Sequence, residues 1–276
     1  MTAPLRLLAC QIAIPPTPDP AARDAHMRRV ASLLDTALTE APADLVVLPE
    51  LTTVDYGRES FDRLDRLAEE LDGPSFAALS ALASRHATHI AYGFPRRADD
   101  GYRITQALID PSGAPAGHYD KLHLAQYGAS MEKDYFTTGD RLLVAGIAGI
   151  EVAPIICYDI RIPELARTLC RGHGAGLLLH CGAYYTDQSY YSWHHFVVTR
   201  ALENQVYMLS LNRAGQTYGG SLFCPPWVDE TAEPVRFGAA EELRRFVIDP
   251  AGIARARRAY SFLADAREDY GDIPLR

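Results

Sequence analysis

Three side chains that can do chemistry follow or lie in short apolar stretches of the sequence. Glu50 comes directly after DLVVLP, Lys121 lies within GHYDKLHL, and Cys157 ends EVAPIIC. A carboxylate, an amine and a thiol together supply the groups that acyl transfer needs: a nucleophile, a proton acceptor and a cation that stabilises an oxyanion. Because α/β folds gather ligand sites at the ends of strands, we expect these residues to share one site.

The surroundings of Cys157 favour a reactive thiol. The sequence continues as CYDIRIPE, and Pro163 opens a predicted helix. Backbone N–H groups and a helix N-terminus stabilise a thiolate and can bind an oxyanion, so the pattern predicts a lowered pKa for Cys157. Taken alone, however, a cysteine that ends a buried strand is more often a small packing residue.

Strands and helices alternate along the chain without a repeat or a flexible linker. Strands are predicted at residues 5–14, 44–49, 88–124 (three in succession), 151–157, 176–182 and 206–215, with weaker ones in GGSLF, RRFVIDP and IARARRAY. Helices are predicted at 19–41, 73–87, 163–173 and 189–205. This mixture predicts a single α/β or α+β domain over 1–276, with a core at about 5–259. The tail at 260–276 is expected to pack across the surface or onto another subunit.

Composition excludes several classes of protein. The 276 residues carry 27 basic and 35 acidic side chains, a net charge of −8, without a basic block, so nucleic acid is not an expected partner. No stretch approaches the roughly 18 apolar residues of a membrane helix. The five scattered cysteines lack a CxxC pair and indicate a reducing, cytoplasmic location.

Four blocks of the sequence resemble the nitrilase, or carbon–nitrogen hydrolase, superfamily. LVVLPELTT, YDKLHL and IICYDIRIPE match its three active-site blocks in chain order, and MEKDYFTTGD resembles the stretch that carries a second active-site glutamate, here Glu132. The resemblance implies a four-layer α-β-β-α sandwich with Glu50, Lys121 and Cys157 as a catalytic triad. It also implies that no metal or organic cofactor is used and that two chains pair into an eight-layer homodimer or a larger homo-oligomer.

The resemblance also implies a mechanism. Glu50 would deprotonate Cys157, Lys121 and the backbone N–H of Tyr158 would hold the oxyanion, and water would release a carboxylic acid from a thioester. Glu132 would orient Lys121 or the substrate amino group. Alternatively, Glu132 is an exposed acid, because its block carries four charged residues in ten.

The neighbours of the cysteine indicate a branch of the superfamily. Cys-Tyr-Asp-Ile-Arg-Ile-Pro-Glu resembles the amidase branch that includes ω-amidases and Nit-type enzymes, so a small primary carboxamide is the expected substrate. The segment His180–Tyr185 departs from the Ala-Asn-Trp-like pattern of ω-amidases and leaves the acyl group open. Hydrolysis of an N-carbamoyl compound or a nitrile, transfer of the acyl group to an amine, and an inactive sandwich that serves as a binding partner are the alternatives.

Several residues are candidates for binding the substrate. Tyr127 falls between Lys121 and Glu132 in the sequence, and Arg161 could bind a substrate carboxylate or pair with Asp159 or Glu164. The predicted substrate-binding residues are Tyr127, Tyr158, Arg161, Cys181 and Tyr184. Residues 223–242 contain Pro-Pro-Trp and are expected to form an ordered loop over the entrance or at an interface.

Overall fold

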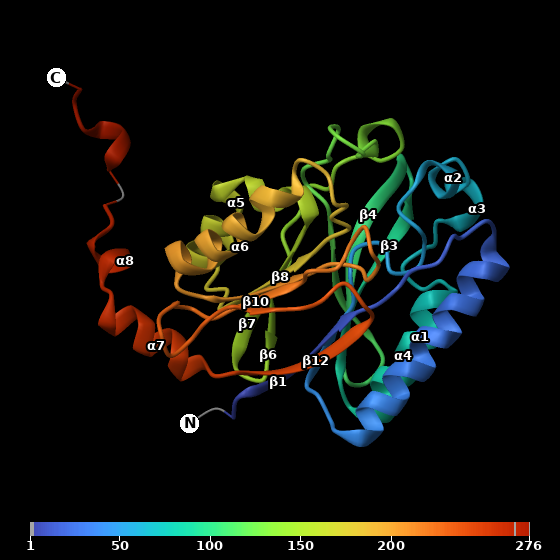
Figure 1. Ribbon diagram of the computed structural model, residues 1–276, viewed down its shortest axis with the longest axis horizontal. Coiled ribbons are helices and arrows are strands. Elements are labelled where there is room, and N and C mark those ends of the chain that lie inside the picture. The colour runs from blue at the N-terminus through green and yellow to red at the C-terminus, as the bar shows by residue number, and fades with distance from the viewer. Residues whose placement is uncertain (1–2, 268, 276) are drawn as a thin grey trace.

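A computed structural model describes residues 3–267 and 269–275 and shows two six-stranded sheets between two layers of helices (Figure 1). The first sheet has the strand order β12-β1-β2-β3-β4-β5. The neighbours β1, β2 and β3 are parallel, and the other pairs are antiparallel. The strands are β1 (Leu5–Gln11), β2 (Leu45–Val47), β3 (His89–Ala98), β4 (Gly101–Ile109), β5 (Pro115–Asp120) and β12 (Glu242–Ile248).

The second sheet has the strand order β11-β10-β9-β8-β7-β6. Its central strands β7, β8 and β9 are parallel, and the flanking pairs are antiparallel. The strands are β6 (Ala145–Ile147), β7 (Ile150–Ile156), β8 (Leu177–Cys181), β9 (Tyr207–Leu211), β10 (Leu222–Cys224) and β11 (Val235–Arg236).

Helices cover the outer face of each sheet (Figure 1). The first sheet is covered by α1 (Pro20–Glu40) and α4 (Pro74–His86), and the second by α5 (Pro163–Arg167) and α6 (Tyr190–Asn204). The remaining helical segments that the structure describes are α2 (Arg58–Phe61), α3 (Leu64–Leu67), η1 (Glu132–Asp134), η2 (Cys157–Arg161), η3 (Thr168–Gly172), α7 (Pro250–Ala259), α8 (Phe262–Asp265) and η4 (Tyr270–Asp272). None of the described helices is long and apolar enough to cross a membrane.

Alternation along the strands builds the layers, because successive side chains of a strand point to opposite faces. Leu7 and Ala9 of β1 pack between the sheets, whereas Leu8 and Cys10 pack under α1 and α4. In the second sheet, Ile155 of β7 faces α5 and α6. Each sheet is therefore apolar on both faces, which is the pattern of a four-layer sandwich, and this part of the prediction is confirmed.

Two sequence predictions of strands are wrong in detail. IARARRAY belongs to helix α7 rather than to a strand. The Asp249 side chain caps this helix by accepting a hydrogen bond from the Ala251 N–H, Pro250 occupies the first turn, and alanine and arginine favour the helix. In addition, β5 ends at Asp120, so Lys121 lies just beyond the strand.

Helix α7 packs through Ile253 against the core between the sheets, and α8 leads away from the sandwich (Figure 1). Trp227, from the loop at 223–242, stacks on Tyr260 with ring centroids 3.7 Å apart. The side chain of Gln205 donates a hydrogen bond of 2.8 Å to the backbone carbonyl of Tyr260. The Pro-Pro-Trp part of the loop therefore holds the base of the tail.

Candidate active site

The two sheets deliver the three predicted residues to a common place. Glu50 follows β2 and Lys121 follows β5, both in the first sheet, while Cys157 follows β7 in the second. Gly93 allows the turn at Glu50 to pack closely against β3. A Cβ at Gly93 would lie 2.5 Å from the Pro49 carbonyl oxygen and 2.6 Å from the Leu51 nitrogen.

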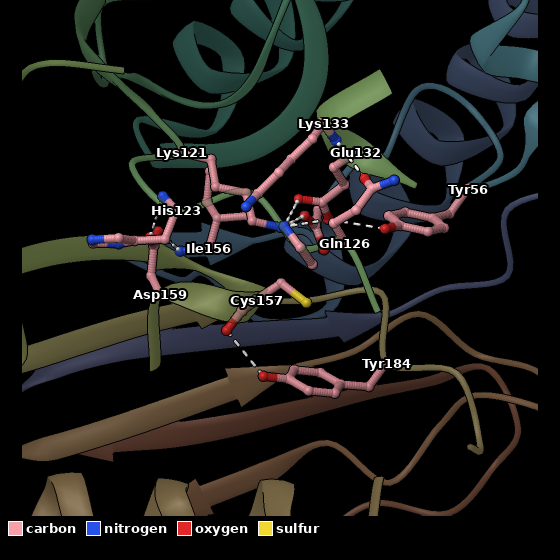
Figure 2. A network of polar contacts seen from close by, with 12 residues as sticks. Tyr56, Lys121, His123, Gln126, Glu132, Lys133, Ile156, Cys157, Asp159 and Tyr184 are labelled. Carbon is pink, nitrogen blue, oxygen red and sulfur yellow. Dashed lines mark hydrogen bonds and ion pairs between the residues drawn. The ribbon is translucent and has the colours of Figure 1, made fainter. Parts of the chain in front are cut away.

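A fully buried cluster of charges forms where these segments meet. The Lys121 ammonium donates hydrogen bonds of 2.8 Å to Glu50 Oε1 and 2.7 Å to Glu132 Oε1 (Figure 2). All three side chains are completely buried. One cation thus lies between two carboxylates, which compensates the cost of burying it.

Burial and neighbouring charges shift the pKa values in this cluster. Burial by itself would lower the pKa of Lys121, but Glu132 and Glu50 raise it well above its ordinary value, so the ammonium stays charged. Burial raises the pKa of Glu50 to about 7, against the opposing effect of Lys121 and with a contribution from Glu132. Glu50 Oε2 forms no hydrogen bond with the described residues, which leaves it free to accept a proton.

Glu132 lies in the turn η1 and is held by three donors. Besides Lys121, the Tyr56 hydroxyl donates to Oε1 at 2.9 Å and the Ala125 N–H donates to Oε2 at 2.8 Å. The alternative of an exposed acid is therefore wrong, since Glu132 is fully buried. The density of charged residues around it in the sequence does not reveal that the turn folds inward.

Cys157 has an unusual backbone and a protonated resting thiol. Its φ of 45° lies in the left-handed region, which non-glycine residues rarely adopt. Burial raises the pKa of Cys157 well above its ordinary value, with a further rise from Glu50 that outweighs the opposing Lys121. The predicted lowering of this pKa is wrong, because Cys157 starts the short turn η2 beside a carboxylate rather than a long helix.

Asp159 fixes the turn that carries the cysteine. It accepts hydrogen bonds from the Tyr119 hydroxyl at 2.7 Å, from the Ile156 N–H at 2.9 Å, and from the backbone and ring of His123 at 3.0 and 2.7 Å. The carboxylate of Asp159 thereby joins the start of the turn, at Ile156, to His123 in the segment that follows Lys121.

A cavity of about 190 Å³ opens beside the thiol. Cys157, 9% exposed, lies in its wall, together with Tyr127 and Tyr184 from the predicted substrate-binding set. The other lining residues are Tyr56, Ala129, Ser130, Met131, Ala183, Tyr185, Asp187, Ser189 and Tyr218. Cys181 is fully buried between the two sheets, outside this lining, and Tyr158 is half-buried with its ring 5.5 Å from that of Tyr127.

Arg161 lies behind the cavity wall. Its guanidinium donates to the Tyr127 hydroxyl at 3.2 Å and to Ser192 Oγ at 3.2 Å, and it stacks over the ring of Phe196. Among the described residues it forms no ion pair, so the alternative pairing with Asp159 or Glu164 is wrong. The carboxylate oxygens of Asp159 already accept hydrogen bonds from other donors in and near the turn.

Comparison with known proteins identifies the family. The family model of the carbon-nitrogen hydrolases matches residues 6–257. The chain belongs to this family. It is 32% identical over 235 residues to a 2-oxoglutaramate amidase of Bacillus subtilis, covering 82% of this chain and 86% of that protein. It is 27% identical over 266 residues to omega-amidase NIT3 of Saccharomyces cerevisiae, covering 90% of each.

Solved structures agree with the fold of this carbon-nitrogen hydrolase. A carbon-nitrogen hydrolase of Helicobacter pylori G27 superposes with a TM-score of 0.85 at 24% identity, covering 98% of this chain and 97% of that one. The amidases among the relatives support an enzyme that acts on amides, and the prediction of an enzyme is confirmed.

Some residues of the site were missed in the sequence. Tyr56 contacts Glu132 and Tyr218 lines the cavity, but both lie in irregular segments without a recognisable spacing. The sequence suggests Asp159 only as a partner of Arg161, although a position two residues after Cys157 is suited to capping the turn. Among the described residues, no group of three or more His, Cys, Asp or Glu could hold a metal ion.

Proposed function

We propose that this carbon-nitrogen hydrolase converts a small primary carboxamide into a carboxylic acid and ammonia through a thioester on Cys157. One observation carries the proposal: the thiol lies in the wall of a cavity of about 190 Å³ and directly follows the strand that brings it to the buried Glu50–Lys121–Glu132 cluster. A cavity of this size suits a substrate with few non-hydrogen atoms.

The residues divide the acylation step among them. Glu50 accepts the proton of the Cys157 thiol as Sγ attacks the amide carbon, and the oxyanion accepts hydrogen bonds from the Lys121 ammonium and the Tyr158 N–H. The protonated Glu50 then returns the proton to the amide nitrogen. The carbon–nitrogen bond breaks, ammonia leaves, and the acyl group remains on sulfur.

Deacylation uses the same base. Glu50 accepts a proton from water as the water oxygen attacks the thioester, and the carbon–sulfur bond breaks to give the acid. The proton returns from Glu50 to the thiolate. A carboxyl group with a pKa of about 7 suits both directions of transfer near neutral pH.

Arg161 supports the wall of the site in this proposal. Its hydrogen bond to Tyr127 and its stacking on Phe196 fix a cavity-lining ring from behind. Arg161→Met is therefore expected to raise KM for neutral and acidic amides alike. A rise confined to acidic amides would assign Arg161 to a substrate carboxylate instead.

Ammonia release tests the proposed function. Wild-type enzyme is incubated with carboxamides, N-carbamoyl amino acids and nitriles, beside Cys157→Ala and the matched control Cys170→Ala, which alters a buried free cysteine in the turn η3. Release from a carboxamide that Cys157→Ala abolishes and Cys170→Ala retains is the expected result. Release from ureido compounds or nitriles alone would contradict the carboxamide assignment, and hydroxamate formation with hydroxylamine reports acyl transfer to an amine.

We also propose that the enzyme is a cytoplasmic homodimer. The five cysteines are free thiols, which suits a reducing compartment. The tail beyond α7 carries exposed apolar side chains at Phe262, Tyr270, Ile273 and Leu275, which a second copy would cover. Light scattering after gel filtration is expected to give twice the mass of the chain, and a monomer from a chain ending at Tyr260.

A further inference from the structure

The backbone carbonyl of Cys157 accepts two hydrogen bonds from side chains, one from a residue buried in β8 and one from a residue in the cavity wall. His180 Nε2 lies 2.9 Å from this oxygen, and the Tyr184 hydroxyl donates to it at 2.9 Å. Figure 2 shows the carbonyl directed toward Tyr184, with the sulfur pointing away from it. One carbonyl at the nucleophile thus faces two side-chain donors that take no part in the proposed steps.

The direction of every hydrogen bond in this group is fixed. A carbonyl oxygen only accepts, so His180 Nε2 must carry the proton. Burial lowers the pKa of His180 to about 4, so the ring is neutral and Nδ1 accepts from Ser210 Oγ at 2.7 Å. Ser210 Oγ in turn accepts from the indole N–H of Trp193, a donor only, at 2.8 Å. The chain therefore runs from Trp193 through Ser210 and His180 to the Cys157 carbonyl.

This chain is anchored in the rigid part of the fold. His180 lies on β8, Ser210 on β9 and Trp193 on α6, and all three are fully buried. The Tyr184 ring stacks on Trp193 with centroids 4.4 Å apart and an interplanar angle of 6°. Both donors to the carbonyl are thus held by packing, and little entropy is left to lose when a substrate binds.

The other end of the same peptide group is the N–H of Tyr158. Because a peptide is planar and trans, its N–H points opposite to its C=O. Two donors that fix the Cys157 carbonyl therefore also fix the direction of the Tyr158 N–H. Hydrogen bonds to a carbonyl polarise the peptide and strengthen its N–H as a donor. The left-handed φ of Cys157 makes such support necessary, since this conformation is costly for a residue with a side chain.

We propose that His180 and Tyr184 are positioning residues that aim and polarise the Tyr158 N–H toward the oxyanion of the reaction. This inference rests on the proposed function, in which that N–H stabilises the oxyanion. It gives a role to the segment His180–Tyr185, which departs from the pattern of the ω-amidases, and it extends that role to Ser210 and Trp193.

Tyr184→Phe tests the inference, because it removes one donor and keeps the ring that stacks on Trp193. Tyr207→Phe is the matched control, since it removes a hydroxyl that donates to the Asp249 carbonyl at 3.2 Å, far from the cysteine. Ser210→Ala breaks the chain behind His180. Five quantities are compared: kcat and KM for the best carboxamide, the affinity for butyraldehyde measured by protection of Cys157 from iodoacetamide, the rate of iodoacetamide alkylation itself, and the midpoint of thermal unfolding.

The readouts separate positioning from general damage. Butyraldehyde adds to the thiol and develops an oxyanion, whereas alkylation by iodoacetamide develops none. Tyr184→Phe is expected to lower kcat about tenfold and to weaken butyraldehyde binding about tenfold, the scale of one lost hydrogen bond. KM and the alkylation rate should stay within about twofold of wild type, and Ser210→Ala should show the same pattern more weakly.

Two results would overturn the inference. One is a Tyr184→Phe enzyme whose kcat and butyraldehyde affinity match those of Tyr207→Phe. The other is a lower alkylation rate, a raised KM and a lower thermal stability together, which a merely structural role would produce. If wild-type enzyme released no ammonia from any amide, the proposed function would fail, while the butyraldehyde comparison would still test the positioning.

Discussion

Replacement of Glu132 by glutamine probes the buried charge cluster directly. Glu132 is one of two carboxylates on the Lys121 ammonium, and its second oxygen accepts from the Ala125 N–H. A glutamine keeps the shape but loses the charge. Both oxygens of Glu132 accept hydrogen bonds, so the NH2 group of a glutamine would face a hydrogen-bond donor at one of the two positions. Removing one partner from a buried pair costs about 3–5 kcal/mol. Since Glu50 remains on Lys121, the lower end of this range applies.

The rate depends on the same contact, because Glu132 holds the Lys121 ammonium that stabilises the oxyanion in the proposed mechanism. We expect the oxyanion to lose stabilisation of similar size. About 3 kcal/mol in the transition state lowers kcat about 100-fold, because each 1.36 kcal/mol is about a factor of ten. The pH profile should move as well. The charge of Glu132 raises the pKa of Glu50, so its removal lowers that pKa and shifts the acid limb of kcat/KM to lower pH.

The assay is steady-state ammonia release between pH 5 and 9 with the best carboxamide. Glu151→Gln, on an exposed position of β7, is the control and should behave as wild type. A kcat of Glu132→Gln within threefold of wild type, or an acid limb that moves to higher pH, would refute this account of the cluster.

Three further predictions concern the base and its supports. For wild type, kcat/KM should fall as the pH drops through about 7, because Glu50 must be ionised to accept the thiol proton; a profile flat down to pH 5 would contradict this pKa. Gly93→Ala should lower both activity and the unfolding midpoint, measured by calorimetry, because a Cβ would press on the backbone beside Glu50; an unchanged variant would show that the turn can shift freely. Asp159→Asn, measured by urea unfolding, should reduce the free energy of unfolding by about 2–3 kcal/mol, because a buried acceptor-only group would be replaced by one that also donates; a loss below 0.5 kcal/mol would contradict the role of Asp159 in holding the turn.

Much of the fold could be predicted because hydrophobic periodicity and capping are local signals. Asp19 and Pro20 mark the start of α1, and most side chains of β7 and β8 are apolar. Helix α7 was missed because Ile-Ala-Arg-Ala-Arg alternates like a strand, while the cap at Asp249 lies outside that stretch.

The chemistry of the site could be predicted only in part. Residue types and the order of the blocks indicated Glu50, Lys121, Glu132 and Cys157. Their pKa values depend instead on burial and on charges from distant segments, so the sequence predicted the wrong direction for the thiol. Contacts such as that of Tyr56 with Glu132 join irregular segments, and no local pattern records them.

The central claim is that Cys157 carries the acyl group of the substrate. Acid-quenched enzyme from turnover with the best carboxamide would be digested and weighed by mass spectrometry. The account predicts an acyl adduct on the peptide that contains Cys157, and neither adduct nor turnover in Cys157→Ala. Turnover by Cys157→Ala at the wild-type rate, with no adduct on the wild-type peptide, would contradict it.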